Sequence, residues 1–388
     1  MNWDDIIEDA AATDTGMRRS NNQDCHAIVR ASGAESWKQR GHLFVVADGM
    51  GAHAVGELAS KMACDNIPHH YLKNKTAPPA EAITKAYKDV GMMIHSKASA
   101  NRDFQGMGTT CSTLILRPEG ALIAHIGDSR VYRVRENRID QLSFDHSLAW
   151  ELVRRKHLTP EQAQKAVPRN VITRSLGPDP HLEVDIEGPL PVAPGDVFLL
   201  CSDGLSGPVT DPEIGLFAGN LPPKDAARYL VHFANLRGGL DNITVVVARI
   251  GAWVDPDSNQ ELPRVDPTAA GDARSGGGIG RALAGLFGGK RKAEPAPVEE
   301  HRYQTAECGF SNELLGRVND LVAHSQNVAV EQAWHLDWPS LTGLRRQTKE
   351  ALEQSKPHRA LRSLGESMVI LGTAGRQHKK AKAGNGTH

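Results

Sequence analysis

The stretch of residues 255–300 sets the strongest limit on how this chain of 388 residues can fold. Glycine, serine and proline are concentrated in it, as in the runs SGGG at 275–278 and EPAP at 294–297. A segment of this composition buries too little apolar surface to offset the conformational entropy that ordering would cost. It predicts a flexible linker, so hydrophobic cores are expected only before it and after it.

Before this linker, short apolar runs alternate with helical patterns. The runs that predict strands are residues 42–47, 111–116, 121–126, 131–134, 196–201 and 243–250. Apolar residues at helical spacing predict helices over residues 55–71, 80–98, 147–157, 160–166 and 224–235. This first part is therefore predicted to be an α+β domain over residues 1–254.

After the linker, the pattern is helical throughout. Three apolar stripes are formed by Leu314, Leu315, Val318, Leu321 and Val322, by Leu341, Leu344, Thr348 and Leu352, and by Leu361, Leu364 and Met368. These stripes predict a small all-helical domain over residues 301–375, followed by a basic, disordered tail over residues 376–388. The helices are expected to close on themselves, to pack on the first domain, or to bind an unknown protein.

Composition and charge exclude several classes of protein. The chain has 45 basic and 46 acidic residues, and its net charge of -1 argues against a nucleic-acid partner. Its longest apolar runs, such as residues 197–201, are far shorter than the roughly 20 residues of an integral membrane segment. The acidic N-terminus does not resemble a secretory signal. Five cysteines without a close pair favour a reducing, cytoplasmic location.

Four aspartates stand where an apolar run meets a turn. Asp48, Asp128 and Asp203 follow predicted strands, and Asp241 precedes one, so their carboxylates can meet at the rim of the core. Gathered carboxylates repel one another unless a cation neutralises them, and oxygen ligands without His or Cys favour Mg²⁺ or Mn²⁺. Two such ions suit phosphomonoester hydrolysis. A single Asp-Gly pair more often forms a simple turn, but four such sites in sequence favour a metal cleft.

Eight short motifs follow one another along the chain. They are TGMRRSNNQD at 15–24, VADGMGAH at 46–53, GTT at 108–110, IGDSR at 126–130, DHS at 145–147, RNVITRSLG at 169–177, CSDGL at 201–205 and DNIT at 241–244. In their order and spacing, residues 8–252 resemble the PPM-type (type-2C) metal-dependent Ser/Thr protein phosphatases in their bacterial form. The resemblance implies an α-β-β-α sandwich of two antiparallel sheets flanked by helices, with a metal cleft at one end.

The resemblance also implies metal ligands. Asp48, Asp203 and Asp241 correspond to ligands of a centre of two Mn²⁺ or Mg²⁺ ions, together with the backbone carbonyl of Gly49. Asp128, with Asp203, corresponds to the site of a third and weaker ion.

Further roles follow from the same resemblance. Arg19 corresponds to the arginine that holds the substrate phosphate, and a forked, permanently charged guanidinium suits that task. Gln23 and Asp24 correspond to residues that support the metal centre.

The motif at 46–53 departs from eukaryotic relatives in one important respect. Met50 stands where those relatives carry a histidine that is thought to be the general acid. His53 and His146 are conceivable replacements, although a structural role is the more common one for such histidines.

The implied activity is hydrolysis of phosphoserine and phosphothreonine in proteins by a metal-bound water or hydroxide, counteracting a bacterial Ser/Thr kinase. Two alternatives remain at this point. The first is a catalytically weak or silent adaptor that binds phosphoproteins and recruits a partner through its C-terminal helices. The second is a phosphomonoesterase that acts on small molecules.

Overall fold

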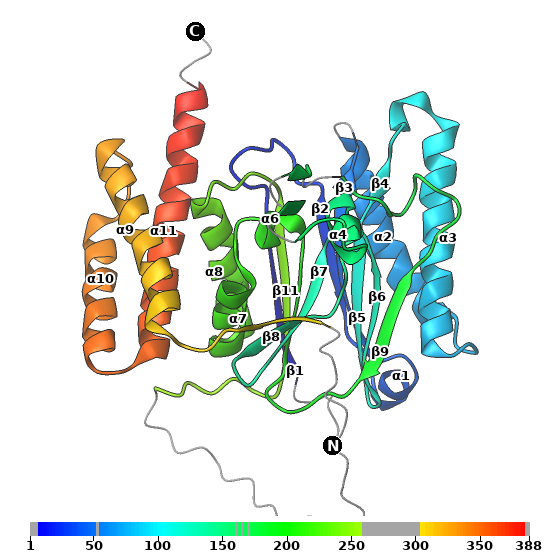
Figure 1. The fold of residues 1–388 in the computed structure, drawn as a ribbon, viewed down its shortest axis with the longest axis horizontal. Coiled ribbons are helices and arrows are strands. Elements are labelled where there is room, and N and C mark those ends of the chain that lie inside the picture. The colour runs from blue at the N-terminus through cyan, green and yellow to red at the C-terminus, as the bar shows by residue number, and fades with distance from the viewer. Residues whose placement is uncertain are drawn as a thin grey trace, which may run out of the picture.

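The computed structural model describes residues 7–51, 54–159, 162–163, 166–168, 171–257 and 303–384. Two antiparallel sheets lie face to face, and helices cover both outer faces (Figure 1). This is the α-β-β-α sandwich that the resemblance implied. From residue 258 onward, the predicted linker lies outside the described residues.

Both sheets are built from antiparallel neighbours. The first sheet has the order β1-β11-β10-β7-β8-β12, and the second has the order β2-β3-β5-β6-β9, with β4 pairing with β3. The strands of the first sheet are β1 (Ile7–Asp14), β7 (Arg130–Arg135), β8 (Arg138–Gln141), β10 (Val197–Cys201), β11 (Ile243–Ile250) and β12 (Gln304–Glu307). Those of the second are β2 (Asp24–Val29), β3 (His42–Met50), β4 (Gly108–Thr109), β5 (Cys111–Arg117), β6 (Gly120–Ile126) and β9 (Asp185–Leu190).

Helices cover the outer face of each sheet. α2 and α3 pack on the second sheet, and α7 and α8 pack on the first. The helices up to residue 257 are α1 (Ala34–Gln39), α2 (Ala54–Lys73), α3 (Pro79–Ala100), α4 (Leu148–Arg154), α6 (Asp203–Ser206), α7 (Asp211–Asn220) and α8 (Pro223–Leu236), with a 3₁₀ turn at Arg102–Phe104. Among the described helices, none combines the length and the apolar composition that crossing a membrane requires.

The central strands are buried on both faces, which explains their continuous apolar runs. Alternate side chains of a strand point to opposite faces of a sheet. In β3, Phe44 and Val46 pack between the sheets, whereas Leu43 and Val45 pack against the helices of the second sheet. A strand of this kind does not show the polar alternation of a sheet that faces water on one side.

The residues beyond 302 do not form a separate domain. β12 pairs with β8 and so extends the first sheet. Three helices follow, α9 (Asn312–Glu331), α10 (Trp338–Glu353) and α11 (Pro357–Gly384), and they lie beyond α8 as a further layer (Figure 1).

One continuous core joins these helices to the sandwich. Val318, Leu364 and Met368 from the predicted stripes are buried in the same cluster as Tyr229 and Phe233 of α8. The predicted helices are therefore present, and of the three arrangements expected for them the described residues show packing on the first domain. An apolar stripe indicates that a helix face is buried and does not indicate which surface buries it.

Most residues of the predicted tail lie in a helix. α11 continues through residue 384, where the sequence predicted a tail from residue 376. Arg376 pairs with Asp14, and the ring of His378 lies 6.0 Å from that of Trp334, centroid to centroid. These contacts give the last turns of α11 partners that a basic, glycine-containing sequence does not reveal. Residues 385–388 lie outside the described residues.

The shared core predicts that the sandwich and the C-terminal helices unfold together. Substituting Leu364→Ala removes a fully buried side chain beside α8 and should lower the free energy of unfolding by about 2–5 kcal/mol. Urea denaturation should show a single transition that moves to lower urea. Leu352→Ala, on an exposed part of α10, is the control and should change little. Two transitions, of which Leu364→Ala moves only one, would contradict the shared core.

A buried ion pair fixes α7 against the end of α8. Glu213 accepts hydrogen bonds from the backbone and side chain of Thr210, and both of its oxygens accept from Arg237 at 2.7 Å. Burial alone would raise the pKa of Glu213, but the hydrogen bonds from Arg237 and Thr210 outweigh it and hold this pKa below its ordinary value. The pair therefore stabilises the fold above the ordinary pKa of glutamate, and the contribution is lost as the pH falls through the lowered pKa.

Substituting Glu213→Gln should lower the free energy of unfolding by about 2–3 kcal/mol at pH 7, because it leaves Arg237 without its carboxylate. The difference from the wild type should shrink as the pH falls below about 4, since the wild-type carboxyl is then protonated as well. Urea denaturation at several pH values measures this. Glu350→Gln, an exposed pair on α10, serves as the control. A difference that stays constant down to pH 3 would refute the assignment.

Candidate active site

The predicted site residues lie on strand ends and turns at one end of the sandwich. Arg19 is on the turn between β1 and β2, Asp48 is near the end of β3, and Asp128 lies between β6 and β7. Asp203 opens α6 directly after β10, and Asp241 directly precedes β11. The structure places them near one another: Arg19 bonds to Asp241, and Asp128, Asp203 and Asp241 are close enough for their charges to act on the carboxyl group of Asp48.

Strand register accounts for this meeting of distant segments. Asp24 opens β2 and stands opposite Asp48 in β3. Asp14 closes β1 opposite Ile243, the first residue of β11. Antiparallel pairing thus places the start of one strand beside the end of its neighbour, and the intervening turns share one rim.

The GTT motif holds the backbone of Asp48 in place. The amide of Asp48 donates to Oγ1 of Thr110 at 2.9 Å, and its carbonyl accepts from the amide of Thr110 and from Oγ1 of Thr109, each at 2.9 Å. Oγ1 of Thr110 also lies 2.8 Å from Oγ of Ser129, next to Asp128. The two threonines thus connect the end of β3 to the turn that carries Asp128.

Gly49 and Gln23 form a second close contact. The amide of Gly49 donates to the carbonyl of Gln23 at 3.0 Å, and the side-chain amide of Gln23 donates to the carbonyl of Gly51 at 3.3 Å. A β-carbon on Gly49 would lie 2.0 Å from the carbonyl oxygen of Gly56. Only glycine allows the chain to pass this close to the start of α2.

Asn242 is a structural organiser that the sequence reasoning missed. Its side-chain amide donates to the carbonyls of Thr15 and Asn21 at 3.0 and 2.9 Å, and its oxygen accepts from the amide of Gln23 at 2.8 Å. One side chain therefore ties the loop of Asp241 to the turn of Arg19. The sequence signal for Asn242 is its position directly after Asp241 in the DNIT motif.

Burial and mutual repulsion set the protonation of the aspartates. Burial, followed by the charges of neighbouring aspartates, raises the pKa of Asp48 well above its ordinary value. The same causes raise the pKa of Asp128 to about 8 and that of Asp203 to about 6. Burial also raises the pKa of Asp24 to about 7, against hydrogen bonds from Ser202 and Thr244. Oγ of Ser202 donates to Oδ2 of Asp24 at 2.7 Å.

This chemistry fits divalent cations. In the part of the chain that the structure describes, Oδ1 of Asp24, Asp128 and Asp203 is buried and has no hydrogen-bond partner. A cation beside such oxygens would supply the missing partner and reverse the upward pKa shifts. The same described residues contain no three His, Cys, Asp or Glu side chains arranged as a ready metal cage. Mg²⁺ does not need one, because it is held by one or two carboxylates and completes its shell with water.

Arg19 lies at the exposed rim of this cluster. Its Nη2 donates to Oδ2 of Asp241 at 2.7 Å, and half of its side chain is open to solvent. The hydrogen bond to Asp241, together with the charges of Asp241, Asp48 and Asp203, raises the pKa of Arg19 against the effect of burial. A permanent cation thus stands next to the carboxylates, where an anionic group can reach it.

His146 has a structural role. Its Nε2 pairs with Oδ2 of Asp185 at 3.0 Å, and its Nδ1 accepts from the amide of Gly127 at 3.1 Å. Because the ring is buried and both nitrogens are engaged, it has no free N–H to offer to a leaving group. His53, the other conceivable acid, lies outside the described residues.

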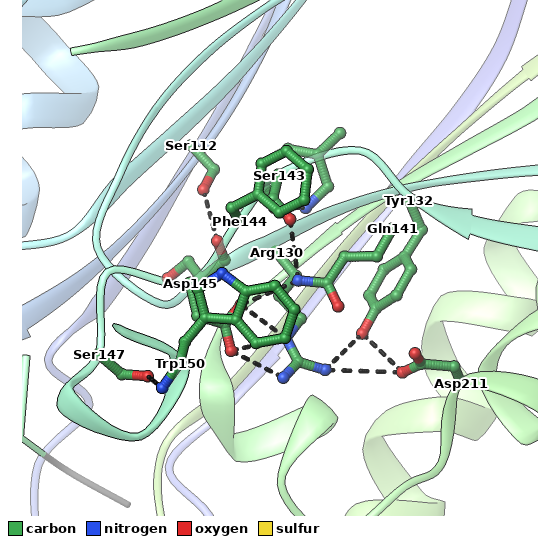
Figure 2. A network of polar contacts seen from close by, with 12 residues as sticks. Ser112, Arg130, Tyr132, Gln141, Ser143, Phe144, Asp145, Ser147, Trp150 and Asp211 are labelled. Atoms are coloured by element: carbon green, nitrogen blue, oxygen red, sulfur yellow. Dashed lines mark hydrogen bonds and ion pairs between the residues drawn. The ribbon is translucent and has the colours of Figure 1, made fainter. Parts of the chain in front are cut away.

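A polar network supports the rim beside Asp128 (Figure 2). Arg130 donates through Nε and Nη2 to the carboxylate of Asp145, at 3.0 and 2.7 Å, and through Nη1 to the hydroxyl of Tyr132. That hydroxyl donates to Asp211 at 2.8 Å, and Gln141 donates to Asp145 at 2.9 Å. The network fixes the loop between β8 and α4 and connects the IGDSR motif to the DHS motif.

The fold and this site together define a class, the metal-dependent protein phosphatases. Residues 17–235 match the family described as Protein phosphatase 2C, and the chain belongs to this family. Among its relatives is the protein phosphatase PhpP of Streptococcus pneumoniae, which is 35% identical over 246 residues, 62% of this chain and 96% of the relative.

Solved structures agree with this family. The serine/threonine phosphatase of S. agalactiae is 31% identical, has a TM-score of 0.58, and is matched over 63% of this chain and 99% of its own. The catalytic domain of PstP in complex with two manganese ions is also 31% identical, with a TM-score of 0.54 and coverage of 64% and 99%. Phosphatases of this family use Mn²⁺ or Mg²⁺.

Proposed function

We propose that this chain dephosphorylates phosphoserine and phosphothreonine in proteins, using the carboxylate cluster and Arg19 as its active site. The observation that carries the proposal is the meeting of Asp48, Asp203 and Asp241 at one rim, with Arg19 bonded to Asp241. Buried carboxylates from separate loops repel one another, and a cluster of such groups with raised pKa values is typical of a functional site.

Each residue of the cluster has a chemical role in this proposal. Asp48, Asp203 and Asp241, with the carbonyl of Gly49, would hold two Mn²⁺ or Mg²⁺ ions, and Asp128 with Asp203 would hold a third. When bound, these ions activate a water molecule and neutralise phosphate oxygens.

The surrounding residues bind the substrate and support the ligands. Arg19 leaves Asp241 to bind the phosphate through its forked guanidinium, which positions the phosphorus for attack. Asp24, held by Ser202, and Gln23 keep the first turn in place beside the ligands.

A covalent cysteine route is disfavoured by the environment of Cys201. This thiol is buried in β10, and burial raises its pKa, so it is not available as a thiolate nucleophile. Direct attack by water, with no phosphoenzyme, is the route that the remaining groups support.

The adaptor alternative is less well supported than catalysis. A module that only binds phosphoproteins has no need for several buried carboxylates that raise one another's pKa. We propose further that the enzyme acts in the cytoplasm and opposes a bacterial Ser/Thr kinase. All five cysteines are free thiols, which fits a reducing compartment.

Dephosphorylation of a phosphothreonine peptide with added Mn²⁺ tests this function. Asp48→Asn and Asp241→Asn should each lower turnover by several orders of magnitude, because each removes a carboxylate from the cluster. Asp65→Asn is the control, since Asp65 is an exposed aspartate of α2 paired with Lys61.

Calorimetry with Mn²⁺ on the same variants separates catalysis from binding alone. The wild type should take up Mn²⁺, and the two active-site variants should bind it more weakly. Equal turnover in all four proteins would refute the proposal, as would a wild type that binds phosphopeptide and Mn²⁺ without hydrolysis.

A further inference from the structure

α11 reaches from the base of the molecule to the rim of the active site. At its start, the amide of Arg359 donates to Asp257 at 2.7 Å, which ties this end to the first residues of the predicted linker. Midway, Glu366 accepts from the hydroxyl of Tyr229 at 2.7 Å and also pairs with Arg228. α11 therefore runs alongside α8, and its last turns extend beyond α8 (Figure 1).

The two helices approach closely enough to make this alignment rigid. A β-carbon on Gly365 would lie 2.2 Å from the ring of Tyr229, so the side of α11 that faces α8 tolerates no side chain at this position. Because a helix has a fixed rise per residue, the position of α11 beside α8 also determines where the last turns of α11 lie.

Arg376, near that end, contacts the turn between β1 and β2. Its Nη2 donates to Oδ1 of Asp14 at 2.5 Å. The same oxygen accepts from the amide of Gly16 at 2.8 Å and from the side chain of Asn235 at 3.2 Å. Asp14 thus receives donors from its own turn, from α8 and from α11.

This turn is bonded to the loop of Asp241. The amide of Met17 donates to the carbonyl of Gly239 at 2.7 Å. A β-carbon on Gly16 would lie 2.1 Å from the carbonyl oxygen of Asp241, and Gly16 has a φ of 78°, which favours glycine. Two residues beyond Met17 the turn carries Arg19, whose guanidinium bonds to Asp241.

We propose that Arg376 is a positioning residue for the phosphatase reaction: by fixing Asp14, it holds the turn that presents Arg19 to the substrate phosphate. The proposal rests on the proposed function and adds to it a role for the C-terminal helix. Arg376 touches neither the carboxylate cluster nor the place of the phosphate, and it acts only through Asp14 and the turn. The expected consequence is on substrate binding, because Arg19 is the group that the turn carries.

Steady-state kinetics with a small chromogenic phosphate and a phosphothreonine peptide test this role. Arg376→Ala should raise KM about tenfold for both substrates and lower kcat much less, since a misplaced guanidinium weakens binding of the phosphate. Arg376→Lys keeps the charge and should stay within about threefold of the wild-type KM. Lys380→Ala removes a charge from an exposed position one turn further along α11 and is the matched control.

A double-mutant cycle with Asp14→Asn identifies the path. If Arg376 acts through Asp14, Arg376→Ala should have little further effect on KM in the Asp14→Asn protein. A purely structural role would lower the melting temperature and the amount of active enzyme while KM stayed at the wild-type value. A wild-type KM in Arg376→Ala, or fully additive effects in the cycle, overturns the proposal.

Hydrogen exchange gives a readout that does not depend on catalysis. The amides of Gly16 and Met17 should exchange faster in Arg376→Ala than in the wild type or in Lys380→Ala, because their turn has lost its anchor. If every protein, including the wild type, lacks phosphatase activity, the proposed function fails and exchange alone decides whether Arg376 holds the turn. Unchanged exchange at both amides overturns the positioning role.

Discussion

The repulsion between buried carboxylates at one rim is the constraint on which the rest of the structure depends. Burial and neighbouring charges raise the pKa values of Asp48, Asp128 and Asp203, so the fold holds these carboxyl groups close together against their mutual repulsion. The restraint comes from uncharged contacts. Thr110 holds the backbone of Asp48, and Asn242 joins the loop of Asp241 to the turn between β1 and β2. The sandwich behind them provides a stiff base, because its central strands are packed on both faces.

Support for the rim comes from two layers of the fold. On one side, the network around Arg130 and Asp145 fixes the loop beside Asp128 (Figure 2). On the other side, α8 leads directly into the loop of Asp241, and α8 is itself held by Glu213 and by α11. The geometry of the site therefore depends on contacts behind its loops as well as on contacts within them. This matches the general expectation that functional geometry requires a packed supporting shell.

More of the candidate site than of its surroundings could be predicted from the sequence. The four aspartates stand where apolar runs meet turns, which leaves a local signal, whereas Arg19 was expected only from the resemblance of the motifs. β12 has no such local signal, since Gln304–Glu307 is a largely exposed edge strand without an apolar pattern. The pairing of Asp14 with Arg376 joins residues 362 positions apart and has no local signature either. The stripes of α9 to α11 were visible, but periodicity does not state what a helix face packs against.

The long sequence separation between α8 and α11 has a consequence for biosynthesis. On the ribosome, α8 emerges long before α11, and at usual elongation rates the interval is on the order of ten seconds. During that interval the face of α8 that carries Tyr229 is not yet covered by α11. The nascent sandwich therefore exposes the apolar face of α8 until α11 has been synthesised.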